Sequence, residues 1–169
     1  MGLFDGRKAK KHYEAGTAAL ARGDFARAIR ELQDATVYRP EWTEAQNDFA
    51  VALLAAADFG RANHDPDTHA MHIQELAIEA AKAVNVALRL RPEFPQAHNN
   101  RGRALVKLDR LPEAEEEFRL ALRQRPDYTE AASNLAWLRT QIELLLDSDE
   151  EGFDTPLARE TRNRVLASD

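Results

Sequence analysis

Cysteine is absent from this 169-residue sequence. Its absence excludes a disulfide framework, a zinc or iron–sulfur site with cysteine ligands, and a thiol nucleophile. The sequence also lacks a phosphate-binding glycine loop, a Gly-x-Ser-x-Gly elbow and a His-Glu-x-x-His motif, and its three serines lie in no nucleophile context. We therefore expect a protein that is not an enzyme and that needs no cofactor.

Long apolar runs are missing as well. The longest, residues 49–57, is mostly alanine and falls short of the roughly 18 residues that span a membrane. The N-terminal residues lack the apolar stretch of a secretory signal, and Gly6 stands where a myristoylation motif requires Ser or Thr. The 23 basic residues are outnumbered by 29 acidic ones, which argues against binding to nucleic acid. We expect a soluble, cytoplasmic protein with no membrane insertion and no nucleic-acid partner.

Helix-forming residues dominate the composition, and the seven glycines and seven prolines fall mostly between periodic segments. No segment is convincing as a strand. The decisive feature is an internal repeat. The pattern Arg, Pro, acid, aromatic, two variable residues and Ala occurs three times, at residues 39–45, 91–97 and 125–131.

Each copy of this pattern is preceded by two alanines at fixed distances. Seven and then five residues separate the members of each set: Ala28, Ala35 and Pro40; Ala80, Ala87 and Pro92; Ala114, Ala121 and Pro126. The proline ends one helix, and the acid after it suits the N-terminus of the next. Thr43 with Gln46 resembles a capping box. Small residues at helical spacing let a neighbouring helix approach closely, so the pattern predicts stacked pairs of antiparallel helices.

Pro92 and Pro126 lie 34 residues apart, which is the period of the tetratricopeptide repeat. Two repeats resemble this family closely, one at Gly16, Gly23, Asp24, Phe25, Ala28, Leu32, Ala35 and Pro40 and the other at Gly102, Leu105, Asp109, Ala114, Phe118, Ala121 and Pro126. The departures are His12 and His98, where the family often has Trp, and Ala15 and Arg101, where it usually has Leu.

The resemblance implies an all-α fold, a right-handed α-solenoid of antiparallel helix pairs that occupies residues 1–146. We expect repeats at about 9–42, 43–94 and 95–128, followed by a helix at 129–146. The helices of the three repeats should span 8–21 and 24–38, 43–58 and 68–90, and 95–108 and 111–124. An acidic linker and a C-terminal helix should follow within 147–169. That helix would either cap the stack or fold back into its groove.

Repeat two is too long for one period, because Pro40 and Pro92 lie 52 residues apart. The excess falls near 57–77, so we expect a lengthened helical hairpin with a loop near 59–67. This insertion contains three of the five histidines: His64, His69 and His72, with Asp65 beside the first. These side chains could form a metal site or a pH-sensitive interface. A solvated hairpin tip with no metal is the simpler interpretation.

In the tetratricopeptide family, the first helix of each repeat lines a concave groove that holds a segment of a partner protein. By position, the resemblance implies these groove residues: Lys10, Tyr13, Thr17, Asn47, Val51, Asn99, Asn100, Arg103, Lys107, Ser133, Asn134 and Trp137. The asparagines suit capture of a peptide backbone, since an amide donates and accepts at once.

Charge in the groove should be of two signs. Arg103 and Lys107 predict a positive spot, whereas Glu44 and Asp48 predict a negative one in the neighbouring repeat. The family's carboxylate clamp for chaperone tails needs Lys and Asn where this chain has Tyr13 and Thr17. We therefore expect no binding to those tails.

Three functions remain open at the level of sequence. The first is a non-catalytic adaptor or scaffold that binds a protein or peptide segment in the groove. The second is a structural subunit that forms a homo-oligomer by stacking or by exchanging its last helix. The third is a metal- or pH-responsive module built on the histidines of the insertion.

Overall fold

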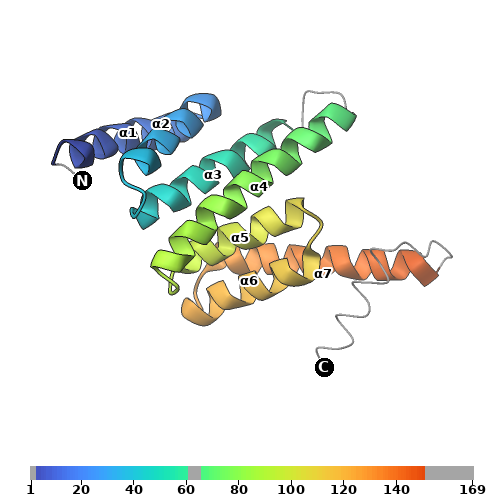
Figure 1. Cartoon of the computed structure of the whole chain (residues 1–169). Coiled ribbons are helices and arrows are strands. Elements are labelled where there is room, and N and C mark those ends of the chain that lie inside the picture. The colour runs from blue at the N-terminus through green and yellow to red at the C-terminus, as the bar shows by residue number, and fades with distance from the viewer. Residues whose placement is uncertain (1–2, 61–65, 151–169) are drawn as a thin grey trace.

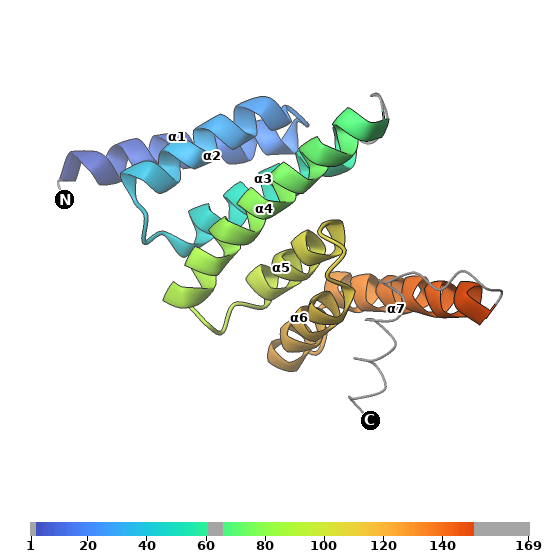
Figure 2. The ribbon, with the colours of Figure 1, turned by 45° about the vertical axis from the view of Figure 1, so that its right-hand side comes forward.

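The computed structural model describes residues 3–60 and 66–150, and within these ranges it consists of seven α-helices without a strand. The helices are α1 (Leu3–Ala21), α2 (Phe25–Tyr38), α3 (Thr43–Gly60), α4 (Pro66–Leu90), α5 (Pro95–Lys107), α6 (Leu111–Gln124) and α7 (Thr129–Glu150). Consecutive helices form antiparallel pairs that stack in chain order, with α1 and α7 at opposite ends (Figures 1 and 2). This is the all-α solenoid that the sequence predicts.

The expected ranges of α2 to α6 agree with the structure to within two residues. The outer helices are longer than expected, because α1 begins at Leu3 and α7 continues to Glu150. No proline or glycine interrupts residues 141–150, so nothing local stops α7 at 146. The predicted C-terminal helix and residues 61–65 of the predicted loop lie outside the described residues. Among the helices that are described, none has the length and apolar character to cross a membrane.

The recurring arginine of the sequence repeat packs on the recurring aromatic ring. The guanidinium carbon lies 5.3 Å from the ring centroid for Arg39 and Trp42, 3.7 Å for Arg91 and Phe94, and 3.6 Å for Arg125 and Tyr128. Each pair spans the turn between one repeat and the next. Such cation–π contacts contribute about 0.5–1 kcal/mol at exposed sites, so the motif stabilises the turn on both sides of its proline.

The two histidines that depart from the family pattern hold the helices of a pair together. His98 Nδ1 lies 2.8 Å from Glu117 Oε2, and its Nε2 lies 3.0 Å from the Pro92 carbonyl oxygen. In the first repeat, His12 Nδ1 lies 2.9 Å from Glu31 Oε2 across the same separation of 19 residues. The hydrogen bond to His12 holds the pKa of Glu31 below its usual value. A polar pair thus stands where the family often has tryptophan.

Gln46 occupies the same repeat position in the second repeat as His98 does in the third. Like His98, it contacts the carbonyl oxygen of the preceding proline. Its Nε2 donates to the Pro40 carbonyl oxygen at 3.1 Å. The capping box predicted for Thr43 and Gln46 is therefore wrong, because the amide is engaged by the preceding turn and the Thr43 hydroxyl donates to Glu44 at 3.0 Å.

Two glycines allow the paired helices to touch. A Cβ added at Gly102 would lie 2.5 Å from Phe118 Cε1, and one added at Gly16 would lie 2.6 Å from Leu32 Cγ. Phe118 and Leu32 are both fully buried. The glycine that the family pattern shares between repeats is therefore a point of close approach on which core packing depends.

Replacing Gly102 with Ala should destabilise the protein by about 1–3 kcal/mol, because the methyl group overlaps a buried ring. Gly6→Ala is the matched control, since the same change in α1 meets nothing within 4 Å. The control should be neutral or stabilise by up to about 1 kcal/mol through helix propensity. Urea unfolding followed by circular dichroism measures both, and equal effects would contradict the close approach.

Candidate functional site

Hydrogen bonds at two repeat positions join the first helices of successive units. Each rung pairs the fifth position of one repeat with the sixth of the next, and the rungs are Tyr13–Asp48 (2.6 Å), Asn47–Asn100 (2.9 Å) and Asn99–Asn134 (2.9 Å). We call these six residues the polar ladder. It runs from α1 through α3 and α5 to α7, and it arises because the sequence repeats polar residues at these two positions.

The asparagines at the centre of the ladder are buried. Asn99 is 0% exposed, and Asn47 and Asn100 are buried as well. Asn99 Nδ2 also donates to Glu130 Oε1 at 3.1 Å, and Asn47 Nδ2 donates to Asp48 Oδ1 at 3.1 Å. Their amides are thus engaged within the protein, which leaves little of them to meet a partner's backbone. Their expected role in partner binding stays a prediction.

Tyr13 ends the ladder in the first repeat. Burial raises the pKa of its phenol, and the hydrogen bond and negative charge of Asp48 raise it further. The Tyr13 ring also packs on Trp42, with 4.5 Å between the ring centroids. The phenol therefore stays protonated and donates to Asp48 throughout the neutral range.

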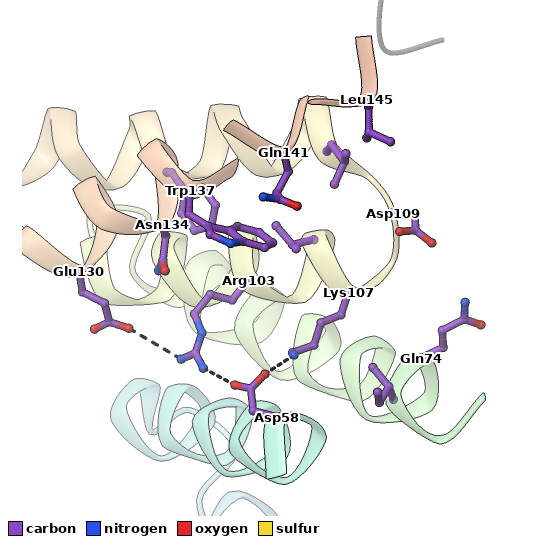
Figure 3. A pocket seen from close by; sticks show the side chains of 14 residues that line it. Asp58, Gln74, Arg103, Lys107, Asp109, Glu130, Asn134, Trp137, Gln141 and Leu145 are labelled. Carbon is purple, nitrogen blue, oxygen red and sulfur yellow. Dashed lines mark hydrogen bonds and ion pairs between the residues drawn. The ribbon is translucent and has the colours of Figure 1, made fainter. Parts of the chain in front are cut away.

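A pocket of about 780 Å³ lies beside the ladder, at the end of the stack that contains α7 (Figure 3). Its apolar lining comes from Ile73, Val106, Leu111, Phe118, Trp137 and Leu145. Trp137 is 52% exposed, and its indole points into the pocket between Arg103 and Gln141 (Figure 3). The other eight lining residues are polar or charged, and apolar surface combined with placed polar groups is the usual form of a ligand site.

The charged residues of the pocket pair with one another. Asp58 Oδ2 accepts from Arg103 Nη2 at 3.0 Å, and Asp58 Oδ1 accepts from Lys107 Nζ. Arg103 Nη1 lies 3.8 Å from Glu130 Oε1 (Figure 3). The two cations of the predicted positive spot are therefore paired with carboxylates, and their role in partner binding stays a prediction. The predicted negative spot is also engaged, with Glu44 on Arg91 at 2.8 Å and Asp48 on the ladder.

Asp58 is a pocket residue that the sequence reasoning missed. It lies at the C-terminal end of α3, 45 residues from Arg103 and 49 from Lys107. No family position points to it. The sequence indicates only that Asp58 lies near the end of α3, the first helix of its repeat, and that Arg103 and Lys107 lie near the end of α5, the first helix of the next repeat.

The structure brings part of the predicted groove set together. Arg103, Lys107, Asn134 and Trp137 line the pocket. The other eight predicted groove residues lie outside it: Lys10, Tyr13, Thr17, Asn47, Val51, Asn99, Asn100 and Ser133. The Thr17 hydroxyl donates to the Tyr13 carbonyl oxygen at 3.0 Å within α1, at the far end of the stack from α7 (Figure 1).

The candidate metal ligands do not form a site in the described part of the chain. His64, Asp65 and the side chain of His69 lie outside the described residues. His72 is exposed, and its Nδ1 lies 3.9 Å from Glu75 Oε2. Within the described ranges, no group of three or more histidine, aspartate or glutamate side chains is placed to hold a metal ion.

Sequence comparison relates the chain to tetratricopeptide repeats (TPRs). A family model described as tetratricopeptide repeat matches residues 13–66 and 79–139, and the gap overlaps the insertion predicted near 57–77. A TPR repeat-containing protein of Pseudomonas aeruginosa is 45% identical over 47 residues. The matched stretch is 28% of this chain and 19% of that protein, so the likeness spans less than a fifth of the relative.

Solved TPR domains have a similar fold. The Arabidopsis OM64 TPR domain superposes with a TM-score of 0.67 over 80% of this chain and 98% of its own, at 20% identity. The first TPR domain of human RPAP3 gives 0.68 over 88% and 99%, also at 20% identity. The first TPR of Spaghetti (RPAP3), bound to the HSP90 peptide SRMEEVD, gives 0.65 over 82% and 95%, again at 20% identity.

Removing one side of a buried ladder rung should destabilise the fold. Asn100→Ala should cost about 1–3 kcal/mol, because the buried Asn47 Oδ1 loses its donor. Ser133→Ala, at an exposed ladder-type position, is the control and should change stability by less than about 0.5 kcal/mol. Urea unfolding should also show that Asn47→Ala/Asn100→Ala costs less than the sum of the single changes. Strict additivity would contradict the rung.

Stability should depend on Tyr13 in alkaline solution. The pKa of its phenol is raised in the folded state, so above about pH 10 the unfolded chain ionises first and binds fewer protons than the folded one. Stability should therefore fall as the pH rises past 10, and less steeply in Tyr13→Phe than in the wild type. Urea unfolding from neutral pH upward measures both, and parallel curves would contradict the assignment.

Proposed function

The chain belongs to the tetratricopeptide-repeat family, and from this premise we propose that it is a non-catalytic adaptor that binds a segment of a partner protein. One observation carries the proposal, the pocket of about 780 Å³ that contains the half-exposed Trp137. A tryptophan in a pocket is a frequent anchor point of protein interfaces.

The place of the pocket supports binding of an extended segment. Its walls come from α3 to α7, so that a segment lying there contacts more than one repeat. The first TPR of Spaghetti holds a peptide on a similar fold. The chemistry of binding must differ, since Tyr13 and Thr17 stand where the resemblance implies the Lys and Asn of the carboxylate clamp.

Charge pairing in the pocket supports binding over catalysis. Asp58 and Glu130 accept hydrogen bonds from Arg103, Lys107 and Asn99. A general base or nucleophile needs a lone pair directed at a substrate, and a general acid needs a proton so directed. These groups are directed at each other, so they shape and charge the pocket.

Self-assembly is the second candidate function. Leu144 is 58% exposed on α7, seven residues from Trp137, so the two side chains lie on one side of the last described helix. A second copy would cover both. Light scattering over a range of protein concentrations separates this candidate from a monomeric adaptor.

Affinity capture from an extract of the native cells tests the adaptor. Trp137→Ala should lose a partner that the wild type captures, with affinity reduced about thirtyfold if the residue contributes about 2 kcal/mol. Val37→Ala is the matched control, because Val37 is also an exposed apolar side chain but lies on α2, outside the pocket.

Circular dichroism should show both variants folded. The same partners captured by the wild type and by both variants would count against a function of the pocket. A mass that rises with concentration, together with no captured partner, would favour self-assembly.

A further inference from the structure

The charges of the pocket form two layers. The side chains of Arg103 and Lys107 are only 25% and 17% exposed, whereas those of Asp58 and Glu130 are 51% and 54% exposed. An incoming ligand therefore meets the carboxylates first. The cations lie beneath them and hold them in place by the two hydrogen bonds to Asp58 and the ion pair with Glu130.

The carboxylate of Asp58 has unused acceptor capacity. Each of its oxygens accepts one N–H, from Lys107 and from Arg103, and a carboxylate offers about four acceptor sites. A cation can add to this group without breaking a contact. An incoming anion would have to displace Asp58 from both cations before it could bind them.

Trp137 independently favours a positively charged ligand. The face of an indole is the strongest cation–π acceptor among side chains and attracts Lys or Arg within about 6 Å. Half of this side chain is exposed in a pocket that three carboxylates line against two cations, with Asp109 as the third. Aromatic and carboxylate groups together select a positive charge.

We propose that the segment bound by this pocket is basic. It places an apolar side chain in the apolar part of the pocket, and adjacent Lys or Arg side chains pair with Asp58 and Glu130 and cover the indole of Trp137. This inference rests on the proposed adaptor function and deepens it. It gives the chain a preference opposite in charge to the acidic peptide held by the first TPR of Spaghetti.

Peptide titration of the 169-residue chain tests the inference. The titrated variant carries Trp42→Phe, so that Trp137 is its one remaining tryptophan. Phenylalanine is a suitable replacement, because Phe94 occupies the equivalent position of the next repeat. Two short probes share their leucine positions and differ only in Lys against Glu elsewhere. The Lys probe should change the Trp137 emission and bind at least about tenfold more tightly than the Glu probe, and its binding should weaken as ionic strength exceeds about 0.1 M.

Charge variants of the pocket should reverse this preference. In Asp58→Asn/Glu130→Gln the two cations lose their carboxylate partners, so the Glu probe should now bind more tightly than the Lys probe. Glu93→Gln/Glu143→Gln removes the same charge at exposed positions outside the pocket and should keep the Lys preference. The salt dependence of the unmutated pocket tests the same point without any change to folding.

The outcomes separate this inference from the proposed function. Equal or tighter binding of the Glu probe by the unmutated pocket would overturn the basic partner and leave an adaptor standing. No change of Trp137 emission with either probe would also overturn it. The adaptor itself fails if Trp137→Ala captures the same partners as the wild type, or if the wild type captures none.

Discussion

The polar ladder is the constraint on which the rest of this solenoid depends. Buried amides must keep their hydrogen bonds, because an unsatisfied buried polar group costs about 1–3 kcal/mol. Asn47 with Asn100 and Asn99 with Asn134 therefore fix how the first helices of successive repeats lie against each other. With that offset fixed, Asp58 on α3 reaches Arg103 on α5, and Arg103 reaches Glu130 on α7. The ladder thus contributes to the stacking offset that brings the charged residues of the pocket together.

Within each repeat, other contacts recur with the sequence pattern. Gly102 lets Phe118 close the third helix pair as Gly16 lets Leu32 close the first. These contacts act between neighbours in sequence, so the 34-residue period reports them directly and the helices α2 to α6 follow from it. In the turn between α1 and α2, Gly23 adopts a left-handed backbone conformation with φ of 73°. In the equivalent turn between α5 and α6, Asp109 adopts it with φ of 56°. The repeat thus preserves conformation where it does not preserve the residue.

The pocket was less predictable because its contacts cross between repeats. Arg103 and Lys107 are basic by sequence alone, and only the stacking offset places Asp58 beside them. The burial of Asn99 could not be predicted from its residue type either, because asparagine suits an exposed groove and a buried rung of the ladder equally well. The repeat pattern predicts where the first helix of each repeat lies. Whether a side chain on that helix is exposed or buried depends on how the neighbouring repeat packs against it.

The ladder also explains which positions of the first helices differ in residue type from one repeat to the next. It occupies the fifth and sixth repeat positions, and these are exposed where a neighbour is missing from the described stack, at Glu14 in α1 and Ser133 in α7. The ninth position takes no part in it and carries Thr17, Val51, Arg103 and Trp137 in turn. A scaffold that assigns two positions to its own stacking leaves such positions free to differ, which is how one fold serves unlike partners. In this chain the difference lies at Arg103 and Trp137, which both line the pocket.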